Sequence, residues 1–213
     1  MREYSYLEKA ILNMAICPRY YPEDISYLNL KSNFKDLTEW YIPMTCFCDI
    51  PLHQISYHAE GNSVSSIDQG YGKFSIAFHK EFGIRKGIQP IHYLNENSAH
   101  VEELVNAMHL LLNQVNTAAG INEVLTNFIF EYIRMIRAEE INKIYTNSIP
   151  QTRNGVLEFN VEDVRYIFVE TVQHRERLIR FIRGKRKGKR LSSQEKDILI
   201  SKIMVYDELK EDW

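Results

Sequence analysis

The stretch IPMTCFCDIPL, residues 42–52, contributes the first strand of the predicted fold. Pro43 and Pro51 cannot donate a hydrogen bond to a sheet ladder, so they mark the limits of a strand. The residues between them, Met44–Asp49, are rich in apolar and β-favouring side chains and predict a short strand. The rest of the fold is predicted outward from this strand.

Two thiols in this strand raise the question of a metal site. Side chains alternate across a strand, so Cys46 and Cys48 point to one face and Phe47 to the other. Structural zinc sites usually separate their thiols by two to four residues, whereas one residue separates these. We therefore expect no metal, even with His53 and His58 nearby, and packing of the free cysteines as small apolar side chains. A cysteine nucleophile would need a base within reach, for which the candidates are His53, His58 and His79.

The first half of the chain is predicted to be mainly β. A short helix precedes it, with apolar residues at helical spacing up to Met14 and a stop at Pro18. Residues 17–40 are rich in Tyr, Pro, Asp and Asn without a clean period, which predicts a long, partly irregular connection. Two further strands are predicted at residues 74–78 and 88–94.

The period then changes to that of helices. Apolar residues recur at helical spacing from Val101 to Val115, and Ser98 is a plausible N-cap for this helix. A second helix is predicted from Gly120 to Ile141. The middle of the chain is thus expected to be helical.

The last part of the chain is predicted to be one strand followed by helices. The run VRYIFV, residues 164–169, favours a strand. A helix around residues 178–182 follows. Ser192 and Glu195 then form a capping box ahead of a final helix that runs through Tyr206.

Composition limits the class of protein. The chain has 213 residues, of which 45% are hydrophobic and 25% charged, and its formal net charge is −2. These values predict one folded domain and exclude a polycation that coats nucleic acid. The predicted strands and helices make the fold class of this domain α+β. The sequence lacks a signal-peptide pattern and an apolar run of about 20 residues, and its three cysteines fit a reducing cytoplasm. Phosphate-loop, hydrolase-elbow and zinc-protease motifs are also missing.

A basic tract follows the late strand. Seven lysines and arginines lie within residues 180–190, loosened by two glycines. Such a tract can bind phosphates, and the candidate residues for binding nucleic acid are Arg183, Lys185, Arg186 and Lys187. The alternative is a solvated connection, because only Phe181 offers a ring for base stacking.

An acidic pair stands at the mouth of the late strand. Glu162 and Asp163 precede Arg165, and a carboxylate at a strand end can reach into a cleft. On these residues alone, a surface carboxylate paired with an arginine is the commoner outcome.

The order of the motifs resembles the AbiGi-type abortive-infection family. The match consists of PRY at residues 18–20, IPMTCFCDIPL, His58, YGKFSIAFHKEFGIRKGIQPIHY at residues 71–93, and a late acid-x-x-Arg-Tyr element that begins at Glu162. Proteins of this family belong to bacterial anti-phage systems. The resemblance implies a cytoplasmic phage-defence protein without membrane segments.

The same order is similar to that of ADP-ribosyltransferase folds. It implies an ADP-ribosyltransferase-like split mixed sheet over residues 1–173, with a helical insertion at about 98–145 and a basic helical extension at 174–213. It also implies a toxin that uses NAD as its substrate and places ADP-ribose on a macromolecule, preferably RNA.

The resemblance assigns roles to individual residues. Glu162 would be the catalytic carboxylate, which stabilises the oxocarbenium-like charge as the glycosidic bond loosens, and Tyr71 would assist it. The residues implied in NAD binding are Arg19 for the diphosphate, Tyr20 or Tyr71 as a ring for the nicotinamide, and His58 for the ribose or the substrate. Phe47 is implied as a pocket wall, with a place in the core as the alternative.

A second hypothesis keeps the fold but removes the chemistry. The chain would then be a catalytically inert antitoxin or regulator within a multi-component defence system. A toxin would have a cognate antitoxin as its partner, with a chaperone as a further candidate.

Overall fold

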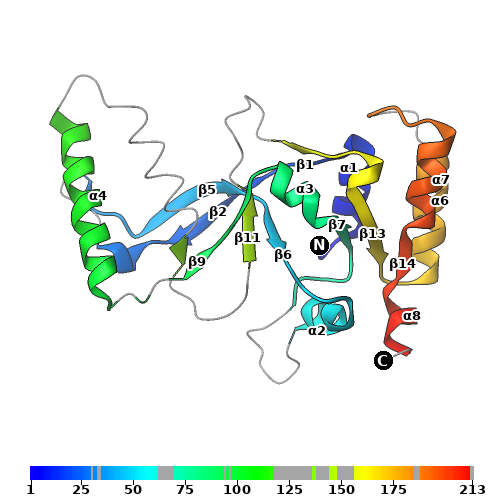
Figure 1. Cartoon of the computed structure of the whole chain (residues 1–213), viewed down its shortest axis with the longest axis horizontal. Coiled ribbons are helices and arrows are strands. Elements are labelled where there is room, and N and C mark those ends of the chain that lie inside the picture. Colours follow the sequence, from blue (N-terminus) through cyan, green and yellow to red (C-terminus); the bar gives the residue numbers. More distant parts are fainter. Residues whose placement is uncertain are drawn as a thin grey trace. The chain divides into compact units, whose positions relative to one another are not determined.

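The computed structural model describes residues 1–29, 31–32, 35–61, 70–93, 95, 97–117, 136–137, 144–147, 156–184 and 188–211. The chain divides into two compact units. Unit 1 comprises Met1–Cys17, Ile50–Lys86 and Thr152–Trp213, and unit 2 comprises Pro18–Asp49 and Gly87–Gln151. Each unit is therefore built from segments that are distant in the sequence (Figure 1).

Unit 1 is built around a three-stranded sheet in the order β14-β13-β7. β13 (Val164–Val169) lies in the middle, parallel to β14 (Ile203–Val205) and antiparallel to β7 (Ser75–Phe78). Most of its side chains are at most 2% exposed: Val164, Ile167, Phe168 and Val169. A strand covered on both faces requires such a run of β-branched and aromatic residues. β13 is thus the core of unit 1.

Helices pack around this sheet. They are α1 (Tyr4–Asn13), α2 (Ile55–Glu60), α3 (Lys80–Arg85), α6 (Val172–Gly184), α7 (Ser193–Ser201) and α8 (Tyr206–Glu211), with short 3₁₀ turns η2 (Leu52–Gln54) and η3 (Val161–Asp163). α6 contacts α1, α7, β13 and β14, and Figure 1 shows it beside α7. It buries Leu178 and Ile182, which are one turn apart. The path from β13 through α6 and α7 to β14 is the helical crossover that parallel strands need.

A short ladder fixes the end of α1. After Met14, whose φ of 49° turns the chain, β1 (Ala15–Ile16) pairs antiparallel with β12 (Leu157–Glu158). The N-terminal helix is thereby tied to the segment that leads into β13.

In its described residues, unit 2 contains short ladders and one long helix. β2 (Arg19–Asp24) pairs antiparallel with β5 (Glu39–Met44) along its whole length. A second sheet places β11 (Ile144–Asn147) between β6 (Cys46–Cys48) and β8 (Ile88–Pro90). The remaining elements are η1 (Ser26–Leu28), β3 (Lys31–Ser32) with β4 (Lys35–Asp36), β9 (His92–Tyr93) with β10 (Ile136–Arg137), and α4 (Ala99–Thr117).

Several predicted elements are confirmed. The N-terminal helix, the strand at 74–78 and the strand at 164–169 are all present. Ser98 accepts a hydrogen bond from the Val101 amide at 3.3 Å, next to the start of α4. The capping box of α7 also forms as predicted. In each case the signal is local to the element.

The predicted long, partly irregular connection over residues 17–40 contains more regular structure than expected. β2 lies there together with the first two residues of β5, and each of these strands contains a proline, Pro22 and Pro43. A proline is tolerated on a strand that has a partner on one side only, and a two-stranded ladder consists of such strands. Taking proline as the limit of a strand therefore caused the prediction to miss these strands. For the same reason the strand after Pro43 was predicted to begin at Met44, whereas Met44 belongs to β5 and β6 begins at Cys46.

Two predicted helices were also corrected. Ile136–Arg137 form β10 and Ile144–Asn147 form β11, so the insertion at about 98–145 is not entirely helical; residues 118–135 and 138–143 lie outside the described residues. Ile203–Val205 form β14 rather than a helical turn. A short apolar run is compatible with either a helix or a strand. These residues form a strand because β13 has an edge with which they can pair.

The predicted α+β class is confirmed, with sheets of mixed direction. The ADP-ribosyltransferase-like arrangement stays a prediction. So does the boundary between residues 173 and 174, although the segment after it supplies β14 to the sheet of unit 1. In the described part of the chain, no helix has the length and apolarity that crossing a bilayer requires.

The capping box of α7 gives a test of the fold. Ser192 Oγ accepts a hydrogen bond from the Glu195 amide at 3.2 Å, and the Glu195 carboxylate accepts one from the Ser192 amide at 2.7 Å. Ser192→Ala should therefore lower the free energy of unfolding by about 1 kcal/mol in urea denaturation. Ser193→Ala, in the exposed first turn, is the matched control and should change it by less than about 0.5 kcal/mol. Equal losses in the two variants would contradict the capping role.

Candidate functional site

Two of the residues predicted to bind NAD stack on each other in unit 1. His58, on α2, and Tyr71, in the turn after it, have ring centroids 4.4 Å apart and planes 7° from parallel. The backbone reinforces the stack, because the Tyr71 amide donates to the His58 carbonyl at 3.1 Å and the Gly72 amide donates to the Ala59 carbonyl at 3.0 Å. The turn is thus fastened along the last residues of α2.

Glycines make this approach possible on both sides of Tyr71. Gly70 has a φ of 63°, and a Cβ there would lie 2.4 Å from the Ala59 carbonyl oxygen. Gly72 has a φ of 89°, and a Cβ there would lie 2.5 Å from the Met1 carbonyl oxygen. L-residues with a side chain rarely adopt these angles, and backbone atoms cannot move aside cheaply. The sequence Gly-Tyr-Gly is therefore required to present Tyr71 in this position.

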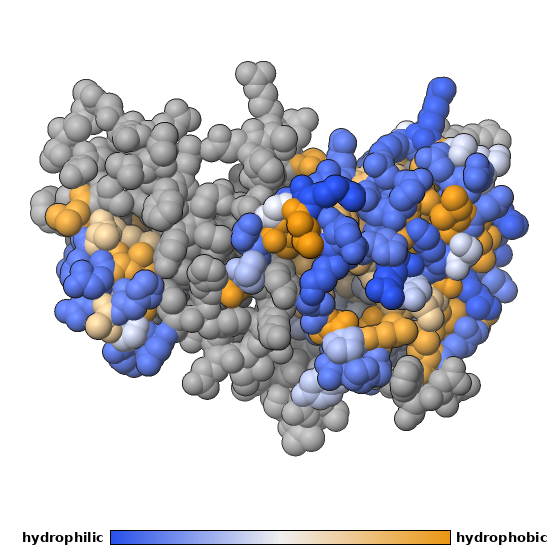
Figure 2. Space-filling model, in the orientation of Figure 1, coloured by the Kyte–Doolittle hydropathy of each residue, from blue (hydrophilic) through white to orange (hydrophobic). Residues whose placement is uncertain are grey.

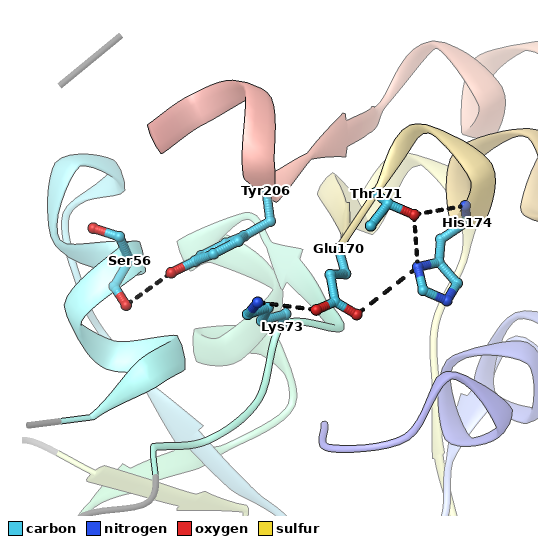
Figure 3. Close-up of polar contacts among 6 residues, drawn as sticks. All are labelled: Ser56, Lys73, Glu170, Thr171, His174 and Tyr206. Carbon is cyan, nitrogen blue, oxygen red and sulfur yellow. Dashed lines mark hydrogen bonds and ion pairs between the residues drawn. The ribbon is translucent and has the colours of Figure 1, made fainter. Parts of the chain in front are cut away.

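Two polar contacts hold the stack at the end of the central sheet (Figure 3). Lys73 Nζ lies 2.9 Å from Oε1 of Glu170, which directly follows β13. Tyr206, at the start of α8 and 1% exposed, donates its hydroxyl proton to the Ser56 carbonyl of α2 at 3.0 Å. One contact fixes the Tyr71 turn and the other fixes α2. β13 and β14 are parallel, so Glu170 and Tyr206, which directly follow these strands, lie at the same end of the sheet.

The charged groups at this end of the sheet are paired. The hydrogen bond to Glu170 raises the pKa of Lys73, although burial acts against it. Burial raises the pKa of Tyr206, helped by the Glu60 carboxylate. Lys73 therefore stays an ammonium group and Tyr206 a neutral hydrogen-bond donor at neutral pH. Their arrangement suits anchoring more than proton transfer.

A histidine completes the cluster. His174 Nδ1 lies 3.0 Å from Thr171 Oγ1 and 4.0 Å from Glu170 Oε2. Its ring stacks on Tyr4 at 5.3 Å and meets the edge of Phe74 at 5.0 Å. These ring contacts from α1 and the start of β7 make it part of the packing between helix and sheet.

Two tyrosines in this region are exposed. Tyr57 on α2 is 65% exposed and Tyr71 is 46% exposed, although large hydrophobic rings are usually buried. Figure 2 shows that hydrophilic residues predominate on the visible face of unit 1 and that hydrophobic residues form small separate patches. We call Tyr57, His58 and Tyr71 the aromatic platform. The rings of His58 and Tyr71 hold each other by stacking, and the exposed rings of Tyr57 and Tyr71 are not needed to fill the core.

Glu162 is presented by a rigid turn at the other end of β13. It is exposed on η3, whose neighbouring residue Asp163 is 7% exposed. The Asp163 carboxylate pairs with Arg85 and accepts a hydrogen bond from the Asn160 amide at 2.7 Å. Lys202 Nζ donates to the Val161 carbonyl at 2.8 Å and to the Val164 carbonyl. Burial lowers the pKa of Lys202, against the opposing effect of the Glu162 and Asp163 charges.

The two predicted catalytic residues lie at opposite ends of this strand. Glu162 precedes β13, whereas Tyr71 is anchored through Lys73 to Glu170 just after it. A strand of this length spans roughly 20 Å. The glutamate at the same end of the sheet as Tyr71 is thus Glu170. Sequence order alone could not separate the two glutamates, because both flank the same β-favouring run.

The other predicted NAD-binding residues belong to unit 2. Arg19 and Tyr20 lie in β2, and Phe47 lies half-buried in β6 opposite Tyr145. That they share one NAD pocket with His58, Tyr71 and Glu162 stays a prediction.

The two cysteines beside Phe47 differ in exposure. Cys46 is exposed and Cys48 is half-buried, and burial raises the pKa of the Cys48 thiol to about 11. Cys48 is therefore protonated at neutral pH and a poor nucleophile. Among the described residues, no group of three or more His, Cys, Asp or Glu side chains is placed to hold a metal ion.

Of the predicted nucleic-acid-binding residues, the structure describes one. Arg183 is exposed in the last turn of α6. Lys185, Arg186 and Lys187 lie outside the described residues.

Comparison with known proteins identifies the family. A family model described as "Putative abortive phage resistance protein AbiGi, antitoxin" matches residues 14–147, more than half of the chain. A protein named "Abortive phage resistance protein AbiGi" from Lactococcus lactis subsp. cremoris is 46% identical over 254 residues, covering 94% of this chain and 100% of that protein. The chain belongs to the AbiGi family. No solved structure matches it.

Membership of the AbiGi family confirms the predicted link to phage defence. The family model includes the aromatic platform and its Gly-Tyr-Gly turn but stops before Glu162, Glu170 and Tyr206. The anchors of the platform were missed by the sequence analysis, since Lys73 and Glu170 are 97 residues apart and Ser56 and Tyr206 are 150 apart. No local pattern marks such pairs.

The turn that carries Tyr71 can be tested with two glycines of similar geometry. Gly70 and Gly87 have φ values of 63° and 66°, but a Cβ at Gly87 would meet nothing within 4 Å. Gly87→Ala should therefore lose only about 1 kcal/mol from left-handed strain, and Gly70→Ala at least about 2 kcal/mol more from the collision with Ala59. Urea denaturation and hydrogen exchange at the Tyr71 amide measure the difference. Similar losses would show that the close approach to α2 is not required.

Proposed function

We propose that this chain is the antitoxin of an abortive-infection pair, which binds a toxin protein and keeps it inactive. The observation that carries the proposal is the family match, whose description names an antitoxin. The matched segment contains the aromatic platform. An antitoxin of this kind needs a binding surface rather than an assembled catalytic centre.

The aromatic platform suits recognition of a protein. Tyrosines are enriched at protein interfaces because a ring buries a large area at a low cost in side-chain entropy, and its hydroxyl accepts or donates a hydrogen bond. Tyr57 and Tyr71 are exposed, and the contacts of Lys73 and Tyr206 hold the backbone beneath them. A preorganised surface of this kind loses little freedom on binding.

Co-expression in a bacterial host tests the antitoxin proposal. Each gene that neighbours this chain's gene is expressed alone and together with the chain, and growth is measured. One of these proteins should stop growth alone and be neutralised by the chain. Tyr57→Ala combined with Tyr71→Ala should weaken binding of the purified toxin by about 30-fold or more, as expected for two anchor residues.

The matched control is Tyr41→Ala, which removes a tyrosine that is 60% exposed in unit 2. It should leave neutralisation unchanged. If no neighbouring protein is neutralised by the wild-type chain, the antitoxin proposal fails. If the platform variant neutralises as well as the wild type, the toxin binds elsewhere.

A second candidate function is ADP-ribosyl transfer from NAD. The observation that favours it is the stack of His58 on Tyr71, two residues implied in NAD binding by sequence resemblance. The exposed ring of Tyr71 offers a π-face to a cationic nicotinamide. A carboxylate beside the glycosidic bond would stabilise the charge that develops there. Glu162 is the catalytic candidate from the sequence, and Glu170 is the carboxylate at the same end of the sheet as the aromatic platform.

Labelled NAD distinguishes the two functions. The chain is incubated with labelled NAD and with RNA, DNA or lysate, and transferred label is measured. An antitoxin should show no NAD turnover. An enzyme should transfer label, and either Glu162→Gln or Glu170→Gln should reduce the rate by about 100-fold or more. The matched control is Glu158→Gln, an exposed carboxylate in β12, which should leave the rate unchanged. Undiminished transfer in both variants would refute these carboxylates as catalytic groups.

A further inference from the structure

Unit 1 carries a cluster of exposed cations that neither proposed function uses. Arg180 and Arg183 lie on the last turns of α6, and Lys189 and Arg190 follow after the three residues outside the described part of the chain. We call these four residues the basic surface. The sequence from 180 to 190 contains no Asp or Glu.

The positive charge is local to one unit. Unit 1 contains 20 Lys and Arg against 16 Asp and Glu, whereas unit 2 contains 6 against 12. The small net charge of the whole chain therefore conceals a basic unit and an acidic unit. An anionic ligand would be drawn to the first of these.

The arginines of α6 fall into two groups. Arg175 pairs with Glu208 and Arg177 pairs with Glu8, each at 3.3 Å, so these two serve the packing of unit 1. Arg180 and Arg183 are exposed, and no carboxylate among the described residues forms an ion pair with either of them or with Arg190. Their guanidinium groups are therefore free to bind an anion.

The chain that carries these cations is fixed rather than left as a solvated connection. Gly188 has a φ of 77°, and a Cβ there would lie 2.1 Å from the Leu12 carbonyl oxygen, so only glycine fits. The Lys189 amide donates to the same carbonyl at 3.2 Å, and Lys189 Nζ donates to Asn160 Oδ1 at 2.8 Å. At the other end, Lys196 Nζ donates to the Arg183 carbonyl at 3.1 Å.

Holding like charges near one another costs electrostatic free energy, because the charges repel, and a mobile linker would avoid this cost. A glycine that fits only by close approach to α1, and lysines that anchor each end, therefore indicate a surface preorganised for an anionic partner. Preorganisation favours binding because less freedom is lost on contact.

We infer that the basic surface binds the phosphate backbone of a nucleic acid. Three of its four cations are arginines, whose planar guanidinium groups bind phosphate through two parallel hydrogen bonds. Protein interfaces are also rich in arginine, but they combine it with aromatic residues, which are not among these four side chains. Phe181, the aromatic residue of this tract, is only partly exposed. The surface thus has the composition of a phosphate-binding site.

The chemistry predicts how the nucleic acid is bound. Without an exposed ring for stacking, the contacts fall on phosphates and carry little sequence preference. Binding should therefore weaken steeply with salt. This inference does not depend on the toxin or on NAD, because the aromatic platform lies at the other end of β13.

The test uses the full chain and two fluorescent probes, a short single-stranded RNA of mixed sequence and a DNA duplex of the same sequence. Fluorescence anisotropy gives Kd at a series of KCl concentrations. Four phosphate contacts predict a slope of log K against log salt of about −3 to −4. Arg180→Gln, Arg183→Gln and Arg190→Gln together should reduce this slope by about 2 to 3 and raise Kd by at least about 10-fold. The probe that loses more affinity identifies the preferred nucleic acid.

The matched control removes the same charge from exposed positions elsewhere in unit 1, through Lys9→Gln, Lys80→Gln and Arg165→Gln together. It should keep Kd within about twofold of the wild type. Unchanged binding in the basic-surface variant would overturn the inference, as would an equal loss in both variants, which would mean that net charge alone attracts the probe. Loss of toxin neutralisation with intact binding of both probes would assign the surface to a protein partner and also overturn it.

Discussion

The burial of β13 is the constraint on which the rest of unit 1 depends. Four of its six side chains are at most 2% exposed, and its backbone is paired on both edges, with β7 and β14. A strand in that position cannot shift its register without exposing a buried residue to solvent. The elements before and after it are therefore held at fixed places. η3 presents Glu162 at one end, and Glu170 receives Lys73 at the other.

This arrangement gives unit 1 two chemically different ends. The basic surface lies near Asn160 and η3, where β13 begins, and the aromatic platform lies where β13 and β14 end. The two surfaces differ in chemistry and lie about one strand length apart, so a ligand bound to one would not block the other. In an antitoxin, nucleic acid bound at the first end would leave the second end available for protein.

The sequence predicts the parts of this structure whose signals are local. The run at 164–169, the capping box of Ser192 and the Gly-Tyr-Gly turn are each recognisable within a few residues. It does not predict β14, because its three apolar residues become a strand only where β13 offers an edge. For the site, motif order implied one pocket for His58 and Tyr71; their rings do stack, and their role in NAD binding stays a prediction. The lysine, glutamate and tyrosine that anchor them are distant in sequence, so their pairing follows from tertiary structure alone.

The interleaving of the two units affects how the protein is made. α1 and β7 are synthesised early, yet their packing partners α6, β13 and β14 are among the last elements to leave the ribosome. Until then, Leu7 and Phe82, which are 0% and 1% exposed in the finished protein, lack the late elements that complete their burial. Long-range pairing of this type is slow and leaves apolar surface open while it is incomplete. A nascent chain whose translation stalls midway would therefore be exposed to proteases, whereas the completed chain buries these residues.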